Sequence, residues 1–139
     1  MYETFEHKAD IGIRGKATSV ERAFCEAAMA MFSIEGNLKK IKKHKKIKIA
    51  CKAENLEELF VEWLNQLLAQ SSIQQMLFSK FSVQKIKNNK LKGYAYGSKI
   101  KKEQELKIEI KAATYSQLKV FFDVKNKKKN WVAQCIVDV

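Results

Sequence analysis

Apolar and polar residues alternate at the start of the chain, over Tyr2–Glu6 and again over Ile11–Lys16. A period of two residues is typical of a β-strand with one buried face, so the pattern predicts two strands joined by a short turn. The turn, Glu6–Asp10, contains a histidine, a lysine and an aspartate. Glycine or asparagine would close a turn at a lower conformational cost, so these polar side chains are candidates for a second role.

Two later stretches have the helical spacing, with apolar residues at i, i+3 and i+4. They cover residues 18–35 and 55–72, and each begins at a good N-cap residue, Thr18 or Asn55, with a glutamate three positions later. We expect their apolar faces to pack against a sheet and to form the core. The side chains expected to be buried there are Phe24, Ala28, Trp63, Leu64 and Leu67.

The remaining segments alternate as strands do. The predicted strands are Lys46–Ala53, Leu77–Ile86, Leu91–Ser98, Leu106–Thr114, Leu118–Val124 and Trp131–Val137. Clean alternation indicates sheets with one solvated face, and the order of the elements favours an α+β fold. We therefore expect two helices packed on one face of a largely antiparallel β-sheet, in a single two-layer domain that covers residues 1–139.

Composition limits the class of protein. The chain has 139 residues, 46% of them apolar, which is typical of one globular domain. No apolar run approaches the ~18 residues of a membrane span, and the start of the chain lacks the regions of a signal peptide. We therefore expect a cytoplasmic protein without a membrane partner. The three cysteines, Cys25, Cys51 and Cys135, contain no Cys-x-x-Cys pair and are expected to be reduced thiols.

The chain is strongly basic, with 27 basic and 15 acidic residues and a net charge of +12. Such a charge favours a nucleic-acid or acidic partner. However, Arg14 and Arg22 are the only arginines, and proteins that read bases and phosphates rely on arginine. The run Lys39–Lys48 is interpreted either as a solvated loop leading into a charged edge strand, or as a patch for RNA or a ligand phosphate. The first interpretation is favoured because no aromatic residue interleaves with the lysines.

Motifs of known catalytic chemistry are missing from the sequence. It contains no glycine-rich phosphate loop, no G-x-S-x-G or H-E-x-x-H motif and no cluster of cysteine and histidine. The only histidines are His7 and His44, and neither has a serine or cysteine neighbour in the sequence. Enzyme functions are therefore disfavoured.

Asp138 interrupts an apolar strand beside the last residue, Val139. Negative groups gathered at a strand end repel each other unless they are solvated or neutralised, and a hard cation such as Ca²⁺ or Mg²⁺ neutralises them through oxygen ligands. Asp10, in the opening turn, would be a second ligand if the first and last strands were neighbours. The alternative interpretation is a solvated strand end and a turn capped by Asp10.

Five blocks of the sequence resemble motifs of the archease family, in the same order. The opening block is His7–Arg14, HKADIGIR, similar to H-T-A-D-V-G-I-x. The helical blocks are Ala23–Phe32, similar to A-A-x-A-M-F, and Asn55–Asn65, similar to L-x-x-L-L-V-E-W-L-N. The last blocks are Glu105–Val120, similar to E-L-K-x-x-V-K-A-x-T-Y-H-x-L-x-V, and Trp131–Val139, similar to W-x-A-x-V-x-x-D-I.

The resemblance implies a function that composition does not supply. Archeases assist the tRNA-splicing RNA ligase, which uses GTP and Mn²⁺ to join RNA ends and is first guanylylated on its own histidine. The resemblance implies that this chain is a protein cofactor of that ligase and not an enzyme. It would promote guanylylation and multiple turnover, and it would meet tRNA only through the ligase.

The resemblance also implies a divalent-cation site, described as Ca²⁺ in the family, with Mg²⁺ and Mn²⁺ as alternatives. Its ligands match Asp10, Asp138 and the backbone carbonyl of Val139. His7 and Lys8 would line the same surface. Lys8 replaces the family's usual threonine, so it would add a positive charge and weaken cation affinity.

Two more positions are candidates for contact with the ligase through the resemblance. Lys111 matches a lysine that the family treats as functional, and Tyr115 lies in the same block. Ser116 departs from the pattern, because the family often has histidine there. Two other functions remain open: a basic RNA-binding module, and a chaperone-like modulator of nucleic-acid enzymes.

Overall fold

The computed structural model describes residues 1–101, 106–125 and 127–139. Glu105, the first residue of the fourth motif block, lies outside these ranges. The elements are β1 (Tyr2–His7), β2 (Asp10–Ala17), α1 (Val20–Glu35), the short 3-10 helix η1 (Leu38–Lys40), β3 (Lys45–Lys52), α2 (Leu56–Gln74), β4 (Met76–Val83), β5 (Lys90–Lys99), β6 (Ala112–Ala113), β7 (Lys119–Lys125) and β8 (Lys128–Asp138).

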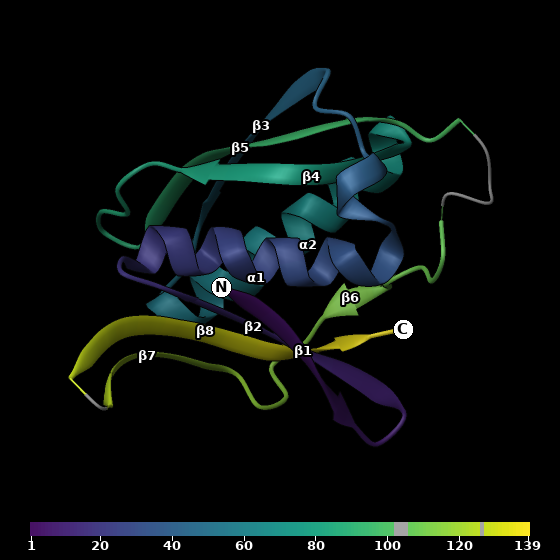
Figure 1. The fold of residues 1–139 in the computed structure, drawn as a ribbon. Coiled ribbons are helices and arrows are strands. Elements are labelled where there is room, and N and C mark those ends of the chain that lie inside the picture. The colour runs from purple at the N-terminus through teal and green to yellow at the C-terminus, as the bar shows by residue number, and fades with distance from the viewer. Residues whose placement is uncertain (102–105, 126) are drawn as a thin grey trace.

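The strands form two antiparallel sheets with the helices between them (Figure 1). Sheet A has the order β1-β2-β8-β6, with β7 also paired to β8, and sheet B has the order β3-β5-β4. The expected α+β fold, with two helices and antiparallel strands, is confirmed. The strands do not form the one sheet of a two-layer domain, however, and the helices have a sheet on each side.

The helices can cover two sheets because each is apolar on more than one side. α1 packs on β2 and β8 of sheet A and on β4 of sheet B. Its Phe32 ring lies 5.4 Å from the ring of Phe78 and 5.6 Å from that of Phe81, both on β4. α2 packs on β3, β4 and β5 and also contacts β6 and β7 of sheet A.

The helix starts follow the capping rules, with one correction. Asn55 caps α2 as predicted, and its Oδ1 accepts a hydrogen bond of 2.9 Å from the Glu58 amide. The cap of α1 is Ser19 rather than Thr18, because the Ser19 hydroxyl accepts from the Arg22 amide at 3.2 Å. The neighbouring residues Thr18 and Ser19 have the same chemistry, so sequence alone did not separate them.

The predicted strand Leu106–Thr114 is largely wrong. Only Ala112–Ala113 pairs as a strand, with the end of β8. The backbone amides before it have other acceptors: Lys107 donates to the Glu35 carbonyl at 2.8 Å and Ile110 to the Glu35 carboxylate at 3.0 Å. The end of α1 therefore takes hydrogen bonds that a sheet ladder would need.

The predicted core is confirmed. Phe24, Ala28, Trp63, Leu64 and Leu67 are all fully buried. The indole nitrogen of Trp63 donates a hydrogen bond of 3.1 Å to the Phe24 carbonyl, so α2 is tied to α1 in the centre of the molecule. The Phe24 and Phe60 rings add a tilted contact with centroids 5.0 Å apart.

Candidate functional site

Sheet A brings three of the predicted site residues into one row. His7 pairs with Asp10 across the β1–β2 hairpin, and Ile11 pairs with Val137 across β2 and β8. Asp10 and Asp138 are the next residues along, at adjacent strand ends. Residues directly opposite each other share a face of the sheet. The row His7–Asp10–Asp138 therefore lies on the face of sheet A away from the helices, because the neighbouring Val137 is fully buried on the helix side.

The turn that starts this row has only two residues, Lys8 and Ala9. Lys8 has a φ of 53°, in the left-handed region that a lysine adopts at a cost of about 1–2 kcal/mol. The short connection sets the register in which His7 lies opposite Asp10. The polar residues of the opening turn thus stand at the tip of a tight hairpin.

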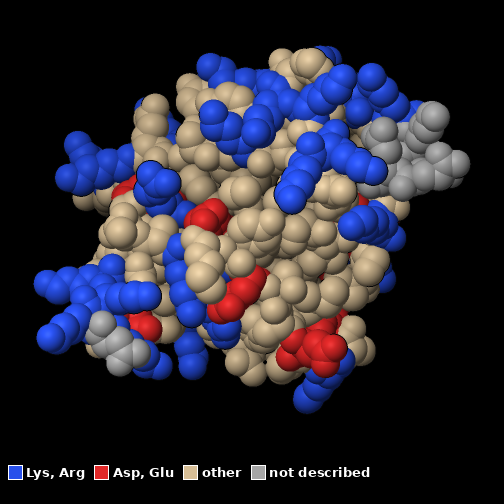
Figure 2. Space-filling view, viewed as in Figure 1, with Lys and Arg blue, Asp and Glu red and all other residues tan. Residues whose placement is uncertain are grey.

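The side chains of the row differ in how far they are exposed to solvent. Asp10 and His7 are half-buried and Asp138 is exposed. The His7 Nδ1 atom is buried and has no hydrogen-bond partner among the described residues. Acidic side chains gather over the β1–β2 hairpin, whereas lysines crowd sheet B and the β7–β8 hairpin (Figure 2). The tip of the β1–β2 hairpin, with Asp10 and the adjacent Asp138, is therefore an acidic tip on a basic protein.

A network below the row holds this face of sheet A together. The Arg14 guanidinium donates to Gln134 Oε1 at 2.9 Å and to Glu3 Oε1 at 2.7 Å, and it lies 4.5 Å from the centre of the Phe5 ring. The hydrogen bond from Arg14 lowers the pKa of the Glu3 carboxyl. Phe5 lies across Gly12, where a Cβ atom would stand 2.2 Å from the ring. These contacts link β1, β2 and β8 beneath the acidic tip.

Lys111 and Tyr115 are not part of the row. The Lys111 amide donates a hydrogen bond of 2.8 Å to the Asp138 carbonyl, but Lys111 itself lies at the edge of a cavity that is also lined by the ends of α1 and α2. Tyr115 is 64% exposed and lines a separate hollow together with Glu58 and Glu62 of α2. The two residues therefore belong to different surfaces.

The row can be tested against the chemistry of a bound cation. Asp10 and Asp138 have carboxylate oxygens at adjacent strand ends, and Val139, the residue after β8, has the next backbone carbonyl. These are the hard donors that Ca²⁺ and Mg²⁺ prefer. Among the described residues, no three His, Cys, Asp or Glu side chains are placed to hold a metal ion. A hard cation at this row would therefore have two carboxylates and would need carbonyl oxygens and water for the rest of its shell.

The cysteines are unpaired thiols, as expected. Burial raises the pKa of the Cys25 and Cys135 thiols to about 12 and that of Cys51 to about 11. The thiolate is the reactive form, so none of the three is an activated nucleophile near neutral pH.

Sequence reasoning missed Glu35, the last residue of α1. Its side chain is 4% exposed, and one carboxylate oxygen, Oε1, has no hydrogen-bond partner in the described part of the chain. Burial raises the pKa of this carboxyl to about 7. A signal was present, because Glu35 follows Ala28 and Met31 at helical spacing on the apolar face of α1.

Comparison with known proteins identifies the family. The sequence model of the Archease protein family (MTH1598/TM1083) matches residues 2–139. The chain belongs to the archease family. The archease of Pyrococcus furiosus is 38% identical over 143 residues, covering 100% of this chain and 99% of that protein. The archease of Methanosarcina mazei is 33% identical, with 99% and 95% covered.

Two solved structures have the same fold as this chain. The solution structure of protein 1598 from Methanobacterium thermoautotrophicum superposes with a TM-score of 0.83 and 28% identity, covering 99% of this chain and 98% of that one. The crystal structure of an archease from Thermotoga maritima, described as a possible chaperone, gives a TM-score of 0.62 at 23% identity, with 100% and 98% covered. In the described ranges, neither helix of this archease has the length and apolar content needed to span a bilayer.

Proposed function

We propose that this archease is an activator of a tRNA-splicing RNA ligase, acting in the cytoplasm as a protein cofactor and not as an enzyme. It promotes guanylylation of the ligase's active-site histidine and lets the ligase turn over repeatedly. The observation that carries the proposal is the row His7–Asp10–Asp138, an acidic tip on a basic member of the archease family. tRNA is reached only through the ligase.

The proposal includes one divalent cation held by Asp10, Asp138 and the Val139 carbonyl. Ca²⁺ is the first choice, and Mg²⁺ and Mn²⁺ are the alternatives, because all three accept oxygen ligands. When bound, the cation supplies positive charge that offsets two adjacent carboxylates and can stabilise phosphoryl charge. Asp10 and Asp138 position it at the tip, and the Arg14 network keeps their strands in register.

The other candidate residues have roles in contact with the ligase. His7 lies opposite Asp10 and is half-buried, so the exposed part of its ring can contact a group of the ligase. The Lys111 backbone holds the end of β8, and its exposed ammonium is available to an acid or phosphate of the complex. Tyr115 is an exposed aromatic residue, which is a frequent type of interface anchor.

The experiment is a ligation assay with the archease at catalytic amounts relative to the ligase. We expect Asp10→Asn and Asp138→Asn to lose nearly all stimulation while their unfolding curves stay close to wild type, because the changed groups lie at a surface tip. Asp123→Asn is the matched control, since Asp123 lies on β7, opposite Asn130 and away from the row. Full stimulation by both variants would refute the role of the acidic tip.

Cation binding has its own readout, independent of the ligase. Calcium added to the wild-type protein should raise the melting temperature, because a ligand that binds only the folded state stabilises it. Asp10→Asn and Asp138→Asn should abolish this shift, and Asp123→Asn should keep it. A shift that survives both substitutions would place the cation elsewhere.

An RNA-binding module is the second candidate, favoured by the exposed lysines Lys39, Lys40, Lys42 and Lys43. It predicts tight binding of tRNA without the ligase, with an affinity that falls steeply with salt. A chaperone-like modulator, the role given for the Thermotoga maritima protein, predicts that the chain suppresses aggregation of unrelated proteins. Ligase stimulation without either result supports the activator.

A further inference from the structure

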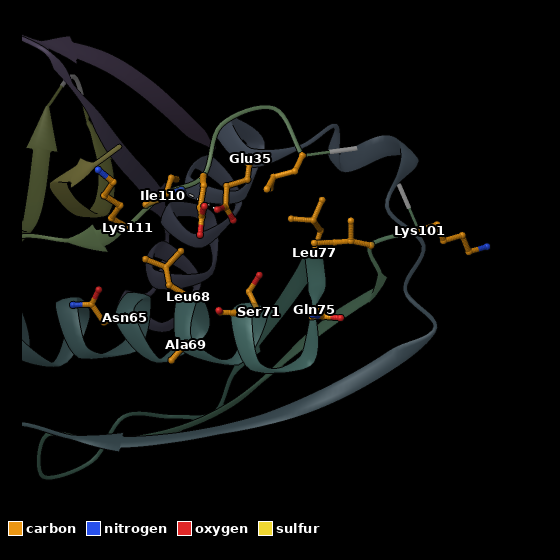
Figure 3. Close-up of a pocket in the computed structure, with 14 residues that line it drawn as sticks. Glu35, Asn65, Leu68, Ala69, Ser71, Gln75, Leu77, Lys101, Ile110 and Lys111 are labelled. Atoms are coloured by element: carbon orange, nitrogen blue, oxygen red, sulfur yellow. Dashed lines mark hydrogen bonds between the residues drawn. The ribbon is translucent and has the colours of Figure 1, made fainter. Parts of the chain in front are cut away.

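A cavity of about 940 Å³ lies where the C-terminal ends of α1 and α2 approach each other, on the helix side of sheet A (Figure 3). Apolar side chains form much of its wall, among them Leu68, Leu77 and Ile110. The volume is far larger than one metal ion and is in the range of pockets that hold small organic molecules. It is separate from the row His7–Asp10–Asp138.

The polar centre of the cavity is the Glu35 carboxylate. Oε2 accepts a hydrogen bond of 3.0 Å from the Ile110 amide, whereas Oε1 is buried without a partner among the described residues. In Figure 3 the carboxylate points into the space between the end of α1 and residues Leu68 and Ser71 of α2. A buried acceptor without a donor is unfavourable, and a ligand that brings the donor removes that penalty.

The surrounding charges select a positive donor. Glu109 also lines the cavity, and its charge acts on Glu35 in the same direction as burial. The last turn of α1 contains no basic residue, so the negative end of its dipole is not offset there. At the end of α2, the Gln74 carbonyl already accepts a hydrogen bond of 2.6 Å from the Lys99 ammonium. The end of α2 is therefore offset by a lysine, whereas the last turn of α1 supplies no basic side chain of its own.

We propose that this cavity binds an organic ammonium group, a primary amine carried on an apolar stem. The ammonium donates to Oε1 of Glu35, and the stem lies on Leu68, Leu77 and Ile110. A purely inorganic cation would leave this apolar wall without a partner. The inference is independent of the ligase and of the acidic tip.

Among the described residues, the charged groups that line the cavity beside Glu35 are Glu109, Lys101 and Lys111, and the lining residues of α2 and β4 are uncharged. Lys107, whose amide donates to the Glu35 carbonyl, is another lysine next to the end of α1 in this region. In Figure 3 the ends of Lys101 and Lys111 point away from Glu35. Because Glu35 has a pKa near 7, the cavity should bind an ammonium better as pH rises through that value. Below it, the affinity should fall by about tenfold per pH unit.

The test is a titration of the full chain with hexylammonium, followed by amide chemical shifts, with hexanol as the neutral probe of the same shape. We expect saturable shifts in residues that line the cavity, with hexylammonium binding at least about tenfold tighter than hexanol near pH 8. A second amine, Nα-acetyl lysine amide, represents a lysine side chain of a partner protein. Tighter binding of hexylammonium would indicate a small-molecule amine as the ligand, and tighter binding of the lysine amide would indicate a lysine of a partner protein.

Glu35→Gln should remove the preference for the ammonium over the alcohol, and Glu57→Gln, at the opposite end of α2, should keep it. Glu109→Gln is a milder variant that should weaken the preference without touching the core, so a folding defect in Glu35→Gln leaves the proposal testable. Equal binding of hexylammonium and hexanol, or no saturable binding at millimolar amine, would overturn it. A buried water would then account for the free oxygen.

Discussion

Trp63 is the side chain through which α2 contacts the centre of the core. It is fully buried, it donates to the Phe24 carbonyl at 3.1 Å, and its ring meets that of Phe81 on sheet B. Trp63→Ala should therefore lower the free energy of unfolding by roughly 3–5 kcal/mol in urea titrations. Trp63→Phe keeps an aromatic ring but removes the indole donor, while the Phe24 carbonyl keeps its helical hydrogen bond, so about 1 kcal/mol should be lost with the indole bond. Similar losses in both variants would show that the hydrogen bond outweighs the packing.

Glu35 makes stability depend on pH. Its pKa in the folded state is about 7, above the ordinary 4.5, so the folded protein holds a proton that the unfolded chain releases. Stability should therefore fall as pH rises from about 4.5 to about 7, by a total on the order of 3 kcal/mol, and then stay level. Urea unfolding of wild type and Glu35→Gln across this range isolates the effect. The difference should vanish in acid and favour Glu35→Gln at higher pH.

At the scale of elements, Gly15 decides how closely α1 lies on sheet A. A Cβ atom at Gly15 would stand 2.3 Å from the Ala23 carbonyl oxygen and 2.3 Å from the Ala27 nitrogen, both backbone atoms of α1. Helix and strand must separate to admit a methyl group, so Gly15→Ala should cost about 3 kcal/mol, at the upper end for overpacking. The measurement is the urea midpoint.

Gly12→Ala is the matched comparison on the same strand. There the obstacle is the far edge of the half-buried Phe5 ring, which can turn aside. The cost should be about 1 kcal/mol. If Gly12→Ala proved the more damaging, the Phe5–Arg14 contact would matter more to sheet A than the approach of α1.

The whole molecule combines a net charge of +12 with an acidic tip. The lysines near η1 act on a partner through a general field, which changes association rates and is screened by salt. Replacing Lys39, Lys40, Lys42 and Lys43 with glutamine should slow activation of the ligase at low salt, and a higher protein concentration should restore it. The measurement is the rate of ligase guanylylation against archease concentration.

Lys111 should behave differently, because it is a single positioned group beside the end of β8. Lys111→Ala should lower the plateau of guanylylation even at saturating archease. If the plateau were instead lost when Lys39, Lys40, Lys42 and Lys43 are replaced, and kept in Lys111→Ala, the result would favour the RNA-binding module.

The spacing of apolar residues along the sequence predicted much of the secondary structure of this fold. The helical spacing behind Asn55 and the alternation over Tyr2–Glu6 depend on contacts within a few residues, so both helices, most of the strands and the five core side chains were predictable from sequence. The archease motifs were equally visible, because each is a short run of letters. The acidic residues Asp10 and Asp138 could be named as candidates from sequence, but their placement could not.

Only the tertiary structure decided which strands pair. Alternation reports that one face is buried and not which neighbour buries it, so one sheet and two sheets have the same pattern. The adjacency of Asp10 and Asp138 follows from the pairing of β2 with β8, between segments more than a hundred residues apart. The segment before β6 alternates like a strand, yet its amides donate to Glu35, because a buried helix end must find donors for its carbonyl and carboxylate oxygens.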